Sequence, residues 1–216
     1  MINQKSGGRH AGMGLRERQR LIRRENILAA ASDLFAAHSF NEVSLEAVAA
    51  RATVSVPTIY SFFKSKHDLL LGLLEEDRHI LEPNLARVVE RLPNDPVQAM
   101  VLIAKSVLLD GYDISRKGVW REILGGSIHM GPEQRSQFRE LLSITAKHVR
   151  VALNKLRGTG SIHDDVDLDS AARIIHSVIR HVFVLYITSE EATVDDLTAM
   201  LEEDLKTVLF GIAIRA

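Results

Sequence analysis

The sequence predicts an all-α fold. After Gly14, apolar residues recur every three or four positions along nearly the whole chain, which is the spacing of one face of an amphipathic helix. Strict alternation of Val or Ile with polar residues, which is typical of half-buried strands, is missing from the sequence. Proline and glycine divide the chain into about nine helical segments. A chain of 216 residues that is 46% hydrophobic is long enough to bury a core between them.

The first two helices have clear expected ends. The first is expected over residues 16–38, and a turn at residues 39–41 ends it. Ser44 is expected to cap a second, short helix that runs to about Ala52, because a serine hydroxyl accepts a hydrogen bond from the free N–H groups of the first turn.

The next two helices also begin at a serine. Ser55 is expected to cap a helix over residues 56–62, with Pro57 in the first turn, where a missing N–H group does no harm. Ser65 is expected to cap a longer amphipathic helix that extends toward Pro83.

Proline and glycine separate the remaining helices. These are expected over residues 96–110, 115–129, 132–157, 168–188 and 194–214. The pair Gly125-Gly126 either bends the second of these helices or ends it.

Composition limits the class of protein. Cysteine is absent, so neither disulfides nor thiolate metal sites are expected. Residues 1–14 are polar and glycine-rich and read as a disordered tail without the apolar stretch of a signal peptide. No apolar run of about 18 residues is seen, so we expect no transmembrane helix. The absence of cysteine is compatible with a reducing cytoplasm, where we expect the protein to be.

Charge is distributed unevenly. Residues 1–68 hold ten Lys or Arg against six Asp or Glu, whereas the rest holds seventeen against twenty-two. A basic N-terminal part on an acidic body favours a polyanionic partner at one end, although basic tails are also common on proteins that bind none.

Two short helices joined by a turn of about four residues are typical of a helix-turn-helix, whose second helix can enter the major groove of DNA. Thr58, Tyr60 and Ser61 offer hydroxyl groups for phosphate oxygens and base edges, and Lys64 and Lys66 flank them as phosphate partners. Taken alone, these residues also fit a plain helical bundle with a solvated lysine face.

The segment 44–69 resembles the TetR family of transcriptional regulators. The resemblance rests on Thr58-Ile59-Tyr60, then Phe63 after two positions, then Lys66 and Leu69, with a matching first helix around residues 27–35 and Phe40. It covers about residues 20–75. It implies a DNA-binding domain over residues 15–68 and a ligand-binding and dimerisation domain over residues 69–216.

The resemblance also implies roles for individual residues. Thr58, Tyr60 and Lys66 would contact phosphates, and Val56, Pro57, Ser61 and Phe62 would face bases or the groove. The predicted DNA-binding residues are Ser44, Leu45, Glu46, Ser55, Val56, Pro57, Thr58, Tyr60, Ser61, Phe62, Lys64 and Lys66.

Two features of this region are unusual. The family usually has glycine where this sequence has Thr53, and a left-handed backbone there would strain a β-branched residue unless the turn is reshaped. A cluster of arginines, Arg16, Arg18, Arg20, Arg23 and Arg24, precedes the motif. It either contacts DNA or is a solvated helix end.

For the body, the resemblance is one of architecture only. It implies a homodimer through helices 168–188 and 194–214, which would read a palindromic operator and leave it when a small molecule binds; the same apolar periodicity also permits an intramolecular core. Candidate ligand contacts are Met100, Trp120, His129, Met130, Phe138, His148, His176, Phe183 and Tyr186.

No catalytic residues, metal site or cofactor are predicted. Asp164, Asp165, Asp167 and Asp169 lack the glycine and the distal glutamate of a calcium loop and are expected to cap the following helix. His176 and His181 are five positions apart and point to different faces. The alternatives are an activator or ligand-independent regulator and, in another class, a helical enzyme or small-molecule binder.

Overall fold

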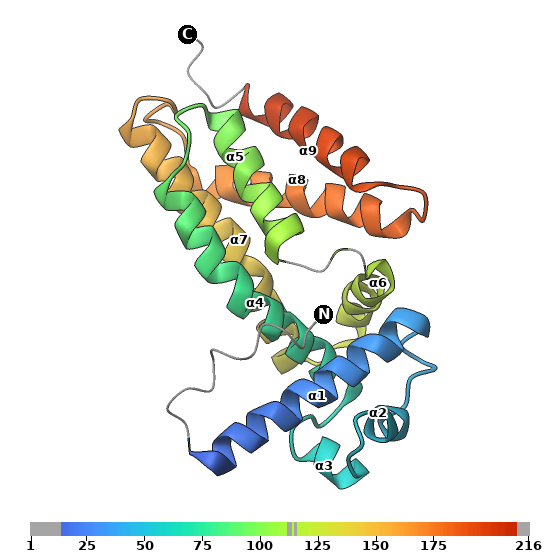
Figure 1. Cartoon of the computed structure of the whole chain (residues 1–216). Helices are drawn as coiled ribbons and strands as arrows, with labels where there is room; N and C mark the ends of the chain where they lie inside the picture. Colours follow the sequence, from blue (N-terminus) through green and yellow to red (C-terminus); the bar gives the residue numbers. More distant parts are fainter. Residues whose placement is uncertain (1–13, 112–113, 115, 211–216) are drawn as a thin grey trace. The chain divides into compact units, whose positions relative to one another are not determined.

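A computed structural model describes residues 14–111, 114 and 116–210 of the chain, and these residues form helices without any strand (Figure 1). The α-helices are α1 (Leu15–Ala37), α2 (Leu45–Arg51), α3 (Val56–Tyr60), α4 (Lys66–Glu90), α5 (Pro96–Lys105), α6 (Lys117–Gly126), α7 (Pro132–Gly158), α8 (Leu168–Thr188) and α9 (Val194–Leu209). A π-helical turn, η2 (Ser106–Gly111), follows α5, and a 3-10 turn, η3 (Ser127–His129), follows α6. The predicted fold class is therefore confirmed.

The chain forms two compact units. Unit 1 comprises Met1–Leu73 together with Gly118–Gln134, and unit 2 comprises Leu74–Lys117 together with Arg135–Ala216. Two helices, α4 and α7, begin in unit 1 and continue into unit 2.

Unit 1 is built on α1. Ile27, Leu28 and Phe35 on this helix are buried, as are Val48 of α2 and Ile59 of α3. Helices of five and seven residues are unstable alone, so α2 and α3 depend on these contacts with a longer neighbour.

Residues 118–134 lie in unit 1, whereas the sequence-based division at residue 68 assigned them to the C-terminal domain. The carboxylate of Glu122 accepts a hydrogen bond from the backbone N–H of Phe40 at 2.6 Å. A Cβ atom on Gly118 would lie 3.0 Å from the backbone oxygen of Ala36, so a side chain there would require α6 or α1 to shift slightly. Neither contact can be seen in a linear hydrophobic pattern.

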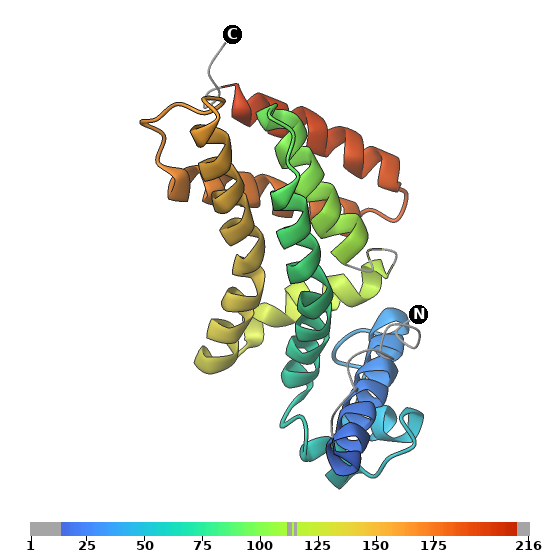
Figure 2. The ribbon, with the colours of Figure 1, turned by 60° about the vertical axis from the view of Figure 1, so that its left-hand side comes forward.

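Unit 2 contains α5, α8 and α9, which pack together, and α7 beside the later part of α4 (Figure 2). Lys155 near the end of α7 donates to the carbonyl oxygen of Val89 near the end of α4, at 3.0 Å. Met100 of α5, Ile175 of α8 and Leu205 of α9 are fully buried.

Helix α8 differs from expectation in one respect. By length and composition alone it is apolar enough to cross a membrane, although the sequence showed no uninterrupted apolar run. Its buried residues pack against α9, which is the behaviour of the core helix of a folded unit.

Some helices end at other residues than predicted. Helix α4 does not end near Pro83 but contains it and continues to Glu90, because the buried Leu81 and Leu85 anchor the helix on both sides of the proline. The glycine pair ends α6, and a Cβ atom on Gly126 would lie 2.8 Å from the Cδ1 atom of Leu70.

Other boundaries fall near or beyond the described residues. The last α-helix ends at Leu209, and the rest of the predicted helix up to residue 214 lies almost entirely outside the described part of the chain, as does the predicted tail apart from Gly14.

Candidate DNA-binding surface

The turn between α2 and α3 is a Schellman motif. Ser44 caps α2 by accepting a hydrogen bond from the N–H group of Ala47 at 3.1 Å. After the end of α2, the N–H of Val54 donates to the carbonyl of Ala49 at 3.0 Å, and the N–H of Thr53 donates to that of Ala50 at 3.2 Å.

Thr53 therefore occupies the left-handed position of this motif, with φ of 56°. It is the only non-glycine residue with positive φ in the described part of the chain. Of the two possibilities left open by the sequence, the turn keeps its shape and the threonine is strained.

A serine cap and one buried anchor fix helix α3. The Oγ atom of Ser55 accepts a hydrogen bond from the N–H of Thr58 at 3.4 Å and lies 2.8 Å from the Oγ1 atom of Thr58. Pro57 lies in the first turn, and Ile59 is fully buried. The predicted start of the helix is therefore confirmed, and the side of α3 opposite Ile59 faces outward.

The outward side carries most of the predicted DNA contacts. Tyr60 is 53% exposed, and Pro57 and Ser61 are exposed beside it. Val56, Thr58 and Phe62 are half-buried. The surface is thus a small patch with hydroxyl groups, a shape and chemistry that suit the floor of a DNA groove.

The predicted DNA-binding residues outside α3 differ in their exposure to solvent. Ser44 and Glu46 are exposed at the start of α2, and Ser55 and Lys64 are exposed at either end of α3. Leu45 is only 9% exposed, so its side chain lies in the core, and the DNA contact expected of this residue stays a prediction.

Lys66 has a structural partner that the sequence did not reveal. Its Nζ atom donates to the backbone carbonyl of Phe40 at 2.6 Å and lies 4.5 Å from the centroid of the Phe40 ring. Since Glu122 takes the N–H group of the same residue, both polar groups of Phe40 are held by side chains.

The centroid of the His67 ring lies 4.8 Å from that of the Phe40 ring. Burial lowers the pKa of His67, which favours the neutral imidazole beside the ammonium group of Lys66.

Arginines of α1 reach the end of α3. The guanidinium carbon of Arg20 lies 5.6 Å from the centroid of the Phe62 ring, and that of Arg24 lies 5.6 Å from the Phe63 ring. The sequence analysis identified the arginine cluster but not these aromatic partners. The pairing could have been suspected from the i,i+4 spacing of Arg20 and Arg24, which matches two adjacent phenylalanines.

The predicted ligand contacts do not form one group. Trp120, His129 and Met130 belong to unit 1, and His129 is exposed. The other candidates, Met100, Phe138, His148, His176, Phe183 and Tyr186, belong to unit 2, where all are buried or half-buried.

Two polar atoms in unit 2 are buried and lack a hydrogen-bond partner among the described residues, the Oγ atom of Ser106 and the Nδ1 atom of His176. Ser106 opens the π-helical turn after α5 and is 2% exposed. Burial lowers the pKa of His176, and the nearby charge of Arg180 lowers it further.

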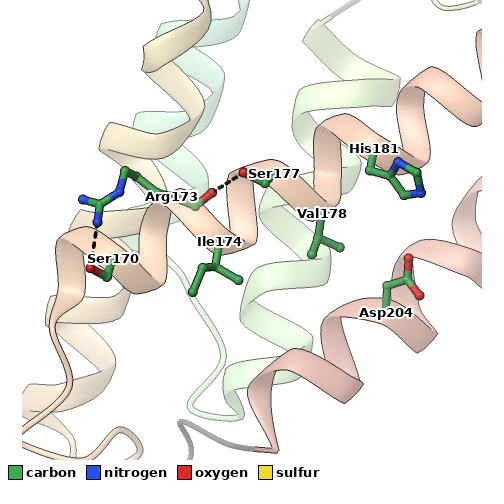
Figure 3. A pocket seen from close by; sticks show the side chains of 7 residues that line it. All are labelled: Ser170, Arg173, Ile174, Ser177, Val178, His181 and Asp204. Atoms are coloured by element: carbon green, nitrogen blue, oxygen red, sulfur yellow. Dashed lines mark hydrogen bonds between the residues drawn. The ribbon is translucent and has the colours of Figure 1, made fainter.

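A shallow hollow lies on the outer side of α8 and α9 (Figure 3). It is lined by Ser170, Arg173, Ile174, Ser177, Val178, His181 and Asp204. The guanidinium of Arg173 donates to the Ser170 hydroxyl at 2.7 Å, and none of the predicted ligand contacts lines the hollow.

The acidic loop before α8 has a structural role. Asp167 caps the helix by accepting hydrogen bonds from the N–H groups of Asp169 and Ser170 and from the Ser170 hydroxyl, which together lower the pKa of Asp167. Within the described residues, no three His, Asp or Glu side chains are grouped to hold a metal ion.

Two short capped helices, supported by a longer one and presenting a hydroxyl-rich face, define a helix-turn-helix DNA-binding protein. Residues 27–73 match the family model described as "Bacterial regulatory proteins, tetR family". These 47 residues therefore resemble the DNA-binding segment of the TetR family of transcriptional regulators.

Two regulators of this type resemble the sequence. The HTH-type transcriptional regulator EthR of Mycolicibacterium smegmatis is 35% identical over 74 residues, which cover 34% of this chain and 34% of EthR. The uncharacterized HTH-type transcriptional regulator YdeS of Bacillus subtilis is 27% identical over 171 residues, which cover 76% of this chain and 79% of YdeS.

Solved structures share the fold. FadR from Bacillus subtilis in complex with stearoyl-CoA gives a TM-score of 0.73 at 19% identity, covering 87% of this chain and 98% of FadR. A regulator from Saccharomonospora viridis in complex with choline gives 0.69 at 19% identity, covering 89% and 98%. The fold of this chain is therefore one that solved transcriptional regulators also have.

Proposed function

We propose that the protein is a cytoplasmic, homodimeric repressor that binds a palindromic operator and leaves it when a small molecule binds unit 2. The placement of α3 is the observation that supports DNA binding. Its Ser55 cap and the buried Ile59 fix the helix so that Thr58, Tyr60 and Ser61 are on its outer side. A helix fixed in this way can enter the major groove without first being ordered by DNA.

The contacts divide by chemistry. The hydroxyls of Thr58 and Tyr60 and the ammonium of Lys64 suit phosphate oxygens, and the half-exposed Val56 suits a thymine methyl group. Lys66 uses one donor on Phe40 and keeps two, so it holds the start of α4 and a phosphate at the same time.

The outer sides of α8 and α9 support a dimer. Ile174 and Leu185 of α8 and Met200 of α9 are 53%, 41% and 37% exposed although both helices already bury an apolar side in unit 2. A second copy packed on this side across a twofold axis would present two α3 helices to successive half-sites of a palindrome.

Unit 2 is proposed to hold the effector. FadR with stearoyl-CoA and the Saccharomonospora viridis regulator with choline show that proteins of this fold take up small molecules. The unpartnered Oγ atom of Ser106 and Nδ1 atom of His176 support an effector with hydrogen-bonding groups, because buried polar atoms normally have partners.

Gel shifts of the full-length protein on the DNA upstream of its own gene test the DNA-binding part. Tyr60→Ala is expected to weaken binding at least tenfold, since it removes an exposed ring and hydroxyl from the centre of the surface. Lys64→Ala should weaken it less, and Lys147→Ala, at an exposed lysine of α7, should leave it unchanged. A wild-type protein without DNA affinity at low salt would sink the proposal.

Lys66→Ala is a poor test on its own. It removes the hydrogen bond to Phe40 as well as a positive charge, so loss of binding would have two causes.

Thermal shifts with stearoyl-CoA and with choline test the effector part. A probe that binds the folded state raises the melting temperature, and the same probe should then release DNA in the gel shift. Stabilisation without any change in DNA affinity would contradict release by ligand, because an effector acts only through different affinities for two states.

A further inference from the structure

The first turns of α1 carry a basic cluster that the helix-turn-helix does not use. Arg16, Arg18, Arg20, Arg23 and Arg24 face only two acidic residues in the same stretch, Glu17 and Glu25. The first four of these arginines are exposed, and within the described part of the chain none of these four is in an ion pair.

Helix stability does not explain this cluster. Arg16 and Arg18 lie in the first turn of α1, at the positive end of the helix dipole, where cationic side chains are unfavourable, and Gly14 at the N-cap has no side chain to cap the helix. Arg16, Arg20 and Arg24 are four residues apart, so equal charges repel one another along one row of the helix. Farther along α1, by contrast, Asp33 pairs with Arg51 at 2.8 Å.

The row of arginines lies beside the end of α3. Arg20 is held over the ring of Phe62 and Arg24 over the ring of Phe63, each at 5.6 Å, and these two phenylalanines directly follow the exposed Tyr60 and Ser61. In Figures 1 and 2 the first turns of α1 lie at the same end of unit 1 as α3. The basic face therefore continues the proposed DNA-binding surface.

We propose that Arg16, Arg20 and Arg23 bind the sugar–phosphate backbone of DNA next to the groove that α3 enters. This inference rests on the proposed function and enlarges its contact surface. A guanidinium group offers paired N–H donors that match phosphate oxygens, and the Phe62 ring holds that of Arg20 in place before DNA arrives. Arg24 is half-buried and acts as a positioning residue at Phe63.

The test measures the dissociation constant of the full-length protein against salt concentration, on a DNA fragment that the wild type binds and on an unrelated fragment of equal length. Each phosphate contact contributes about 0.9 to the slope of log Kd against log salt. The variant Arg16→Ala/Arg20→Ala/Arg23→Ala should therefore lose about 2 to 3 units of slope and bind both fragments ten- to several-hundred-fold more weakly near 0.1 M salt.

A matched control removes the same charge elsewhere. Arg91, Arg139 and Lys147 are exposed in unit 2, and their triple alanine variant should keep the wild-type slope. Arg20→Lys should also keep it, because the charge remains. Relief of the repulsion between the three exposed arginines should offset loss of the contact between Arg20 and Phe62, so the α1 variant should melt close to the wild type.

The outcomes separate the two proposals. If the wild type binds DNA and Tyr60→Ala does not, but the α1 triple variant keeps the wild-type slope, the phosphate role of α1 is overturned and the proposed function stands. Binding to anionic phosphatidylserine vesicles is measured in parallel. If the α1 triple variant loses affinity only for these vesicles and not for DNA, the arginines of α1 bind lipid and the inference is again overturned. If the wild type binds no DNA, the proposed function itself has failed.

Discussion

At the scale of single residues, Thr53 strains the backbone of the turn between α2 and α3. Its φ of 56° places a β-branched side chain in a conformation that costs about 1 to 2 kcal/mol for residues other than glycine. The two hydrogen bonds of the Schellman motif and the buried Val48 and Ile59 on either side hold the turn in spite of this strain.

Replacing Thr53 with glycine should therefore stabilise the protein. Relief of the strain, less the extra backbone freedom of glycine in the unfolded chain, leaves a gain of about 0.5–1 kcal/mol in the free energy of unfolding. Urea denaturation measures it. Thr53→Ala is the control, because alanine keeps most of the strain; equal stability of the glycine variant and the wild type would show that the turn stores none.

His176 should make stability depend on pH. Burial lowers its pKa in the folded state below the ordinary value of 6.5, so the unfolded chain takes up the proton first as the pH falls. The stabilisation is complete above pH 6.5 and is lost as the pH falls toward the folded-state pKa. Wild type should lose more stability than His176→Gln between about pH 7.5 and pH 5.

The positive charge of Arg180 acts in the same direction on His176, and His67 titrates in both proteins, so the difference between the two pH curves isolates residue 176. Parallel curves for wild type and variant would contradict the prediction.

At the scale of helices, the serine caps decide whether α2 and α3 form. The hydroxyl of Ser55 is bonded to both the backbone and the side chain of Thr58. Ser55→Ala should lower the free energy of unfolding by about 1 kcal/mol and weaken DNA binding as well, because α3 has only five residues. Ser136→Ala, at an exposed serine inside α7, should change neither quantity in denaturation and gel-shift measurements.

Helix starts were predictable because they are local. Ser44, Ser55 and Ser65 each cap a helix through a neighbour three residues on, which a linear sequence displays. The continuation of α4 through Pro83 was not predictable, because the anchors that hold it are tertiary contacts of Leu81 and Leu85.

On the candidate DNA-binding surface, too, local features could be predicted from the sequence and tertiary contacts could not. Pro57, Tyr60 and Ser61 could be assigned from motif and spacing, and they are exposed together on α3. The bond from Lys66 to Phe40 joins residues 26 positions apart, and no spacing rule predicts it.

At the scale of the whole molecule, the outer side of α8 should control the assembly. Ile174→Glu places a charge on an exposed apolar residue that lines the hollow of Figure 3, and we expect a monomer with weak DNA binding but an unchanged circular dichroism spectrum. Sedimentation velocity measures the oligomeric state. Val151→Glu, at a similarly exposed apolar position of α7, is the control, and a dimeric Ile174→Glu would place the interface elsewhere.

Residues 118–134 limit how this regulator can be recombined with others. Glu122 and Gly118 come from the middle of the chain, yet they support the loop at Phe40 and the end of α1. A chimera that joins only the first 73 residues to a foreign effector domain would lose both contacts. To transfer the DNA specificity of this protein to a new biosensor, one must graft two segments of sequence rather than one.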